Sequence, residues 1–344
     1  MYFRVDLPAG WFHHVPCQIM DEWIFSIRAD SEFLEAAGEA FVRQRESNPV
    51  YREFLSYSGR LKERVEKLSD IPFLPVEFFR DRRVICGEKP AAIEFRSSGT
   101  TGSKPSIHYV TDPGLYERSF MSSFNLFYGD PGKYLMAALL PSYIEREGSS
   151  LVYMAERLIK ESSHPEGGFY KGDTGLIVKL AAEAATSGRR LFLLGVSFAL
   201  LDLAESGSCD LGGSVVMETG GMKGRRKEII RRELHEILKS RFRISSVHSE
   251  YGMTELLSQA YSSGDGLFYP PPWMKILIRD PLDPFSIYTE AGRTGGINII
   301  DLANINSCSF IATGDLGRIH DDGSFEVIGR FDESDIRGCN LMAV

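Results

Sequence analysis

Short, strongly apolar segments alternate with amphipathic segments through the middle of the chain. The apolar segments have the length of buried strands, and they span residues 135–140 (LMAALL), 191–196 (LFLLGV), 214–219 (SVVMET) and 244–247 (ISSV). The amphipathic segments between them have the spacing of helices, and they span residues 151–160, 176–186 and 225–240. Strands that alternate with helices form a mainly parallel sheet covered on both faces. We therefore predict an α/β fold.

The N-terminal part, residues 1–85, has helical periodicity instead. A helix is expected to follow Asp30 or Ser31, because either side chain can act as its cap. The helical spacing breaks at Pro49 and then resumes as far as Leu68. We predict a helical N-terminal segment that precedes the α/β core.

Two further segments frame this core. IPFLPVEFF (71–79) contains two prolines in five residues and is typical of an extended connector. GRIHDDGSFEVIGR (317–330) alternates in hydrophobicity around turn residues, which favours an antiparallel hairpin. The predicted core therefore spans residues 86–330 and ends in an antiparallel part, followed by a short tail at 331–344.

The composition excludes several classes of protein. With a formal net charge of −8 and no long run of Lys or Arg, the chain is not expected to bind nucleic acid. No stretch approaches the roughly 18 uninterrupted apolar residues of a membrane span. The N-terminus also lacks the apolar run of a secretory signal. We therefore expect a cytoplasmic protein with no membrane span.

The cysteines indicate neither a disulfide framework nor a thiolate zinc site. They are widely scattered without a CxxC pair, at Cys17, Cys86, Cys209, Cys308 and Cys339. His13 and His14 lie close to Cys17 in sequence and could ligate a metal. Packing of this aromatic N-terminal segment on the body of the protein is the simpler interpretation.

The segment SSGTTGSK (97–104) is the most informative part of the sequence. Its glycines permit unusual backbone angles, so that successive N–H groups can point into one concavity and bind a polyphosphate. Its spacing is not that of a Walker A loop, and an ordinary polar loop is the alternative. The predicted phosphate-binding residues are Ser97, Ser98, Gly99, Thr100, Thr101 and Gly102. Lys104 is the predicted catalytic cation.

A second candidate segment is HSEYGMTE (248–255). Tyr251 offers a flat face for adenine, and Gly252 allows a close approach of the backbone. Thr254 can hold a phosphoryl oxygen, while Glu255 offers a hard oxygen ligand for Mg²⁺ and is a candidate catalytic residue. Taken alone, the segment could be a strand-to-helix turn. The candidate nucleotide-binding residues here are Glu250, Tyr251, Gly252, Met253 and Thr254.

These segments resemble motifs of the adenylate-forming superfamily, which includes acyl-CoA synthetases and luciferases. The matching segments, in the family's order, are SSGTTGSKP (97–105), ETGG (218–221), YGMTE (251–255), TGDLG (313–317) and GRFD (329–332). In the first segment Lys104 and Pro105 stand in the reverse of the usual order. The resemblance implies the α/β core of these enzymes, with ATP and Mg²⁺ as cofactors.

The resemblance also implies roles for individual residues. Gly220 and Gly221 would line the adenine, and Asp315 would bond both ribose hydroxyls. A carboxylate suits a vicinal diol because it can accept two hydrogen bonds. Arg330 belongs to the GRFD segment, which marks the hinge before a mobile C-terminal domain in the superfamily. The basic residues at 223–227 are expected to be a solvated helix face, and contact with phosphate is the alternative.

The C-terminal segment GRFDESDIRGCNLMAV (329–344) resembles the end of the acyl-protein synthetases, the fatty-acid-activating subunits of bacterial luminescence reductase complexes. This short branch of the superfamily lacks the full lid domain and its catalytic Lys. Other segments similar to this family are IPFLPVEFF (71–79), LPSYIEREGSSLVYM (140–154), PPPWMKILIRDP (270–281) and IDLAN (300–304). The resemblance implies that Cys339 accepts the acyl group. A plain terminal cysteine is the alternative.

We therefore predict a ligase that converts a carboxylic acid, expected to be a fatty acid, and ATP into acyl-AMP. The acyl group would pass to Cys339 and on to an acyl-CoA reductase-type partner protein. One alternative is a relative of phenylacetate-CoA ligase that ends at the hinge and uses coenzyme A directly. Another is a non-catalytic nucleotide-binding scaffold subunit, which would account for the missing lid Lys and the exchanged Lys104 and Pro105.

Overall fold

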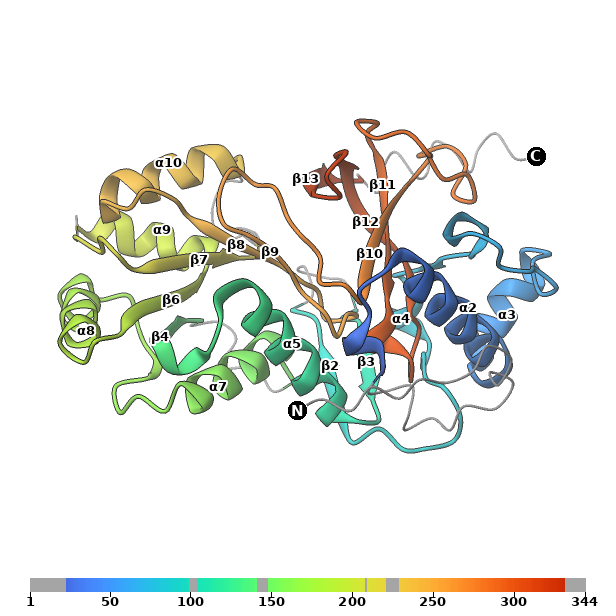
Figure 1. The fold of residues 1–344 in the computed structure, drawn as a ribbon, viewed down its shortest axis with the longest axis horizontal. Helices are drawn as coiled ribbons and strands as arrows, with labels where there is room; N and C mark the ends of the chain where they lie inside the picture. The colour runs from blue at the N-terminus through green and yellow to red at the C-terminus, as the bar shows by residue number, and fades with distance from the viewer. Residues whose placement is uncertain (1–22, 99–103, 141–147, 208, 221–228, 332–344) are drawn as a thin grey trace.

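The computed structural model describes residues 23–98, 104–140, 148–207, 209–220 and 229–331. Two sheets form the two halves of the molecule, and the strands β8, β9 and β13 lie where these halves meet (Figure 1). A separate two-stranded antiparallel ladder joins β2 (Ile93–Arg96) and β3 (Ile107–Val110). This ladder brackets the predicted phosphate loop, because the loop connects its two strands.

The larger sheet has six strands in the order β5-β4-β6-β7-β8-β9, and only β9 runs antiparallel to its neighbour. Every residue of β4 and β7 is buried, as expected for strands covered on both faces. The strands are β4 (Tyr134–Leu139), β5 (Gly168–Phe169), β6 (Arg190–Val196), β7 (Val215–Thr219), β8 (His248–Tyr251) and β9 (Ala260–Ser262). Their parallel order places the ends of β6, β7 and β8 at one edge, where α/β proteins bind ligands.

Helices cover this sheet in two groups. The helices α5 (Pro113–Tyr128) and α7 (Ser150–Ser162) contact one another. The second group consists of α8 (Thr174–Thr186), α9 (Ser197–Ser206) and α10 (Arg231–Phe242), in which α9 contacts both neighbours. Side-chain oxygens cap several of these helices, such as Asp112 at α5 and Asp173 at α8.

The second sheet has the order β1-β12-β11-β10, with β13 paired to β12. Its strands are β1 (Leu74–Pro75), β10 (Met274–Arg279), β11 (Gly295–Asp301), β12 (Phe310–Ile319) and β13 (Phe325–Arg330). The helices α2 (Asp30–Ser47) and α3 (Pro49–Tyr57) lie beside this sheet (Figure 1). Phe41 of α2 packs on Phe310, and Gln44 Nε2 donates to the Asn304 carbonyl at 3.1 Å. The N-terminal helices therefore share the core of this half.

Short helical segments complete the described chain. They are α4 (Phe78–Asp81) and the 3₁₀ helices η2 (Ile24–Ser26), η3 (Leu68–Asp70), η4 (Pro131–Lys133) and η5 (Leu302–Asn304). The sheets and helices share one continuous cluster of buried apolar side chains.

Most of the predicted elements are confirmed, and so is the antiparallel C-terminal part. The strand predicted at 244–247 is wrong: these residues lead into β8, so the HSEY of the second candidate segment is itself the strand. The helix predicted at 225–240 begins at Arg231, since residues 229 and 230 are not helical. The second candidate segment is followed by a turn into the antiparallel β9, so it is not a strand-to-helix turn.

The N-terminal prediction is partly wrong. Asp30 is the first residue of α2 rather than its cap, and Glu32 accepts the Arg28 and Ala29 N–H groups instead. Helix α3 ends at Tyr57, so the helical spacing that continues toward Leu68 reflects packing of separate turns. In the connector, β1 pairs in parallel with β12 before α4 begins.

Candidate active site

The base of the predicted phosphate loop is closed by two serines. The Ser97 N–H donates to the Ser106 carbonyl at 3.0 Å, and the Ser106 N–H donates to Ser97 Oγ at 2.9 Å. These bonds hold both ends of the loop together where β2 and β3 diverge. Ser98 lies beside them, while Gly99, Thr100, Thr101 and Gly102 lie outside the described residues. Ser106 was not predicted, because it follows the motif.

Lys104 lies at the end of this loop on the molecular surface. Its Nζ is 3.1 Å from Asp81 Oδ1 of α4, and both side chains are largely exposed. An exposed pair of this kind contributes little to stability, so Lys104 can leave Asp81 for another anion at small cost. This position is compatible with the predicted role of a mobile cation next to the loop.

Glu255 lies directly at the base of the loop. The residue is 5% exposed, and the Ser106 side chain lies close enough to its carboxyl group to act on its pKa. Burial raises the pKa of Glu255, and only weaker effects, including those of Ser106 and the guanidinium groups of Arg330 and Arg80, act in the opposite direction. Two predicted segments, far apart in sequence, therefore meet at one buried carboxyl group.

Mg²⁺ fits this position. A buried carboxyl with little compensating charge favours the approach of a cation, and carboxylate oxygen is the ligand that Mg²⁺ prefers. In phosphate sites Mg²⁺ takes one or two carboxylates and draws its other ligands from phosphate and water. Within the described part of the chain, no group of three or more His, Cys, Asp and Glu residues could hold a metal by itself. Glu255 is therefore the residue that would hold Mg²⁺ here.

Backbone contacts hold the turn that carries Glu255. The Thr254 carbonyl accepts a hydrogen bond from His108 Nδ1 at 2.9 Å, and the Met253 carbonyl accepts the Leu256 N–H at 3.1 Å. Since a carbonyl only accepts, Nδ1 of His108 carries the proton. The ring is fully buried, and this burial lowers the pKa of His108 to about 4. His108 is a neutral donor that the sequence analysis missed.

A second cluster joins the end of β8 to the strands β12 and β13. The Tyr251 hydroxyl donates to Asp315 Oδ2 at 2.8 Å, and Arg330 Nε lies 3.3 Å from Asp315 Oδ1. Asp315 and Arg330 are direct partners in the β12–β13 register. The Asp315 side chain is 14% exposed, whereas that of Arg330 is 68% exposed. Three residues predicted from three separate motifs are thus in contact.

The Tyr251 ring is buried and packs against two phenylalanine rings. It contacts Phe268 and Phe325, with ring centroids at 5.9 and 5.4 Å. These contacts and the bond to Asp315 fix the ring in one orientation. Burial, followed by the charge of Asp315, raises the pKa of Tyr251 well above its usual value, so the phenol stays a donor.

The end of β7 lies next to these groups. Thr219 and Glu250 are partners in the β7–β8 register, and the Thr219 hydroxyl donates to Glu250. A Cβ at Gly252 would collide with Glu250 Oε1 unless that carboxyl group moved, so glycine suits this position. Gly220 follows Thr219 with a φ of +67°. The predicted adenine segment therefore begins beside the second candidate segment, and Gly221 lies outside the described residues.

A buried ion pair supports the same strand end from the opposite face. The hydroxyl of Ser197 lies 2.9 Å from Glu218 Oε2 and 2.6 Å from the Gly220 carbonyl oxygen. Arg231 Nε donates to Glu218 Oε1 at 3.0 Å. Although burial alone would raise it, the nearby His235, whose Nε2 lies 3.7 Å from Glu218 Oε1, and the charge of Arg231 hold the pKa of Glu218 below its usual value. The sequence analysis missed this group, because its members come from α9, β7 and α10.

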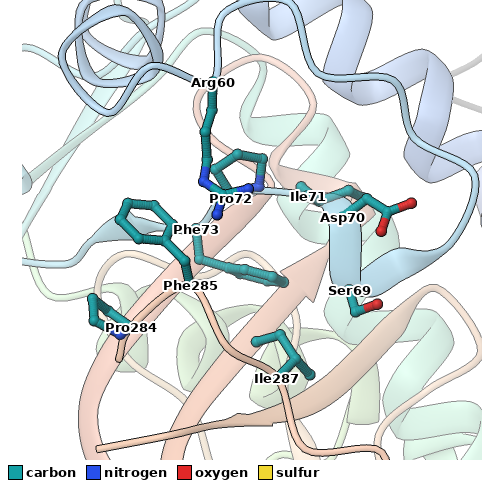
Figure 2. Close-up of a pocket in the computed structure, with 9 residues that line it drawn as sticks. All are labelled: Arg60, Ser69, Asp70, Ile71, Pro72, Phe73, Pro284, Phe285 and Ile287. Atoms are coloured by element: carbon teal, nitrogen blue, oxygen red, sulfur yellow. The ribbon is translucent and has the colours of Figure 1, made fainter. Parts of the chain in front are cut away.

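A shallow pocket elsewhere does not include any of these residues. It lies between the chain that follows α3 and the segment before Ile287, where Arg60 stacks over the Phe285 ring at 4.5 Å (Figure 2). Cys339, the predicted acyl acceptor, lies outside the described residues. Among the helices that the structure describes, none is long and apolar enough to cross a membrane.

The comparisons with known proteins bear on the fold. No protein-family model matches the sequence, and no curated protein is significantly similar to it. Solved structures do match: ATP-bound MatB from Rhodopseudomonas palustris has 18% identity and a TM-score of 0.51, and the match covers 71% of this chain. ATP-bound RpMatB-BxBclM chimeras B1 and B3 have 19% and 18% identity, TM-scores of 0.52 and 0.53, and cover 71% and 72% of this chain.

The chain spans about half the length of these structures, since the matches cover 48% to 49% of them. At such low identity the likeness establishes the fold. The predicted α/β architecture, with mixed sheets and helices, is confirmed, and it is similar to the fold of these solved structures.

Proposed function

We propose that the protein activates a carboxylic acid with ATP. One carboxylate oxygen of the acid attacks the α-phosphorus, and the bond from this phosphorus to the oxygen that bridges to the β-phosphate breaks. Pyrophosphate leaves with the electron pair, and acyl-AMP remains. The observation that carries this proposal is the meeting of the loop's base with a buried carboxyl group. Ser106, which closes the loop, lies beside Glu255, and His108, two residues further on, holds the Thr254 carbonyl at 2.9 Å.

Each described residue has a part in this reaction. Backbone N–H groups of the loop closed by Ser97 and Ser106 would face the phosphates. Glu255 would hold Mg²⁺, which neutralises phosphate charge when it is bound. Asp315, oriented by Tyr251, would accept the ribose hydroxyls, and Lys104 would move from Asp81 to the leaving phosphate. Burial of Glu255 and Tyr251 excludes water from the reacting groups.

The adenine would lie between the end of β7 and the end of β8. The backbone around Gly220 and Gly221 would lie against one face of the purine, and Tyr251 would contact the other. The short separation of these strand ends supports this placement, since Thr219 and Glu250 are register partners. Gly252, which has no side chain, leaves the backbone accessible there.

The second step would transfer the acyl group to Cys339. Its thiolate would attack the acyl carbon, the bond from that carbon to the phosphate oxygen would break, and AMP would leave. The resulting thioester keeps enough activation for transfer to an acyl-CoA reductase-type partner. A fatty acid is the proposed substrate, by the resemblance of the C-terminal segment to acyl-protein synthetases.

The direct test is ATP–[³²P]pyrophosphate exchange across fatty, aryl and amino acids. Exchange that depends on one class of acid would support adenylation and identify the substrate class. Acyl-CoA formation on addition of coenzyme A would instead favour the ligase related to phenylacetate-CoA ligase. ATP binding without exchange for any acid would favour the scaffold subunit and overturn the proposed reaction.

The acyl acceptor has a separate test. Labelled acid and ATP are expected to label the wild-type protein through a bond that hydroxylamine cleaves, and Cys339→Ser is expected to abolish this label. Cys86→Ser is the matched control, because Cys86 is a partly buried cysteine whose thiol contacts the Ser307 carbonyl. Persistence of the labile label in Cys339→Ser would exclude Cys339 as the acceptor.

A further inference from the structure

The turn between β8 and β9 is held by side chains from another part of the chain. Asn304 Nδ2, from η5 beside the second sheet, donates to the Glu255 carbonyl at 2.8 Å. His108 holds the preceding carbonyl, that of Thr254, from β3. Hydrogen bonds thus fix the backbone carbonyl groups of both Thr254 and Glu255. The direction of its side chain depends on these supports.

Asp301 provides the strongest of these supports. Its side chain is fully buried at the end of β11, and its Oδ2 accepts the N–H groups of Leu257 at 2.8 Å and Ser258 at 2.9 Å. Its Oδ1 accepts the Ser258 hydroxyl at 2.6 Å and the Ala303 N–H at 3.1 Å. The Asp301 carboxylate therefore links Leu257 and Ser258, in the turn just after Glu255, to Ala303 of η5.

Burial of the Asp301 carboxylate costs free energy, because the charge loses its hydration. No ion pair to Asp301 is found among the described residues, so only hydrogen bonds compensate its burial. A carboxylate is the side chain that can accept four such bonds at once without offering a donor. Both Asp301 and Asn304 come from the segment IDLAN (300–304), which the proposed reaction does not use.

We propose that Asp301 and Asn304 are positioning residues that aim the carboxyl group of Glu255 at the metal–nucleotide complex. This inference rests on the proposed function of Glu255. Neither residue is placed against the nucleotide itself. Both act through the backbone of the turn, much as outer-shell partners orient the ligands of metal sites in general.

The test is binding of Mn²⁺, measured by electron paramagnetic resonance in the presence of the α,β-methylene analogue of ATP. We expect Asp301→Asn to weaken Mn²⁺ binding by about 10-fold, the lower end of what outer-shell substitutions do. The amide of this variant would face the Ala303 N–H donor and loosen the turn. Asn304→Ala, which removes the bond to the Glu255 carbonyl, should act in the same direction and serves if Asp301→Asn does not fold.

Two further variants make the outcome specific. Leu180→Ala in α8 is the matched control for lost stability, because Leu180 is buried at a distance in the other half of the molecule. It should leave Mn²⁺ binding unchanged. Glu255→Gln reports the proposed function, and it should weaken Mn²⁺ binding strongly.

The results separate the two proposals. Weak binding in Glu255→Gln together with wild-type binding in both Asp301→Asn and Asn304→Ala would overturn this inference alone. Wild-type binding in Glu255→Gln would overturn the metal role of Glu255, and with it this inference. Weaker binding in the Asp301 and Asn304 variants, but not in Leu180→Ala, would support it.

Discussion

The two ends of the candidate site are built differently. At the phosphate end, Glu255 is buried and its turn is tied by Asp301, Asn304 and His108. At the ribose end, Asp315 is held by Tyr251 and by Arg330, whose side chain is 68% exposed. At the phosphate end, these hydrogen bonds hold the turn that carries Glu255. The ribose end rests partly on an ion pair whose arginine is largely exposed and can be displaced by a ligand.

This difference indicates a division of roles. A preorganised carboxyl group in a site shielded from water stabilises developing charge most effectively, so the phosphate end suits the chemical step. Because Arg330 is largely exposed, its ion pair with the half-buried Asp315 is well solvated, so the exchange of Arg330 for a ribose requires little energy. Substitutions at the phosphate end should therefore change the rate of ATP–pyrophosphate exchange, and substitutions at the ribose end should change the affinity for ATP.

The largest effect is expected for Glu255→Gln. Loss of the charge should lower ATP–pyrophosphate exchange by about 100-fold, as removal of one key electrostatic group does in other enzymes. Because burial already disfavours the charged form, urea unfolding should show unchanged or higher stability. Loss of exchange together with lower stability would mean that Glu255 supports the fold rather than the reaction.

The next effect is the pH dependence of stability at the phosphate end. Burial lowers the pKa of His108 from 6.5 to about 4, so the unfolded chain binds more protons between these values. The contribution of neutral His108 to the free energy of unfolding is complete above pH 6.5 and is lost as pH falls toward 4. The loss between pH 7 and pH 5 is about 2 kcal/mol.

The variant His108→Asn tests this contribution. Asparagine keeps a donor for the Thr254 carbonyl but does not titrate. Urea unfolding at pH 7 and pH 5 should therefore show a smaller loss of stability for the variant than for the wild type. An equal loss in both proteins would show that His108 is not the group responsible.

The smallest effect is expected at the ribose end. Asp315→Asn keeps the shape but removes the charge, and it should weaken ATP binding by about 10-fold, since a hydrogen bond to a charged group contributes about 1.5 to 3 kcal/mol. Unfolding free energy should change by less than about 1 kcal/mol, because the partner Arg330 is exposed. Binding of 2′,3′-dideoxy-ATP, which lacks the hydroxyls, should not differ between variant and wild type. A difference there would contradict the ribose assignment.

The sequence was sufficient for those features that depend on local pattern. Short, mainly apolar runs predicted β4, β6 and β7, because strands buried on both faces are rich in apolar side chains. The strand β8 was placed four residues too early, since its polar sequence HSEY does not resemble a buried strand. Its Glu250 is buried because Thr219 donates a hydrogen bond to it from the neighbouring strand.

The supports of the site could not be predicted in the same way. His108 and Thr254, or Asp301 and Leu257, are far apart in sequence and meet only when the two halves pack together. A single polar residue such as Asp301 in an apolar strand is a weak signal, because burial of a carboxylate depends on donors that come from elsewhere. Motif spacing predicted Asp315 together with its partners Tyr251 and Arg330, and it predicted Glu255, but it did not predict the residues that hold the turn of Glu255.

The most direct test of the account is a crystal structure with Mn²⁺ and the α,β-methylene analogue of ATP. We predict an anomalous Mn²⁺ peak at the carboxyl group of Glu255, and ribose hydroxyls within hydrogen-bonding distance of Asp315. A nucleotide bound elsewhere, or Mn²⁺ with no contact to Glu255, would contradict the proposed site.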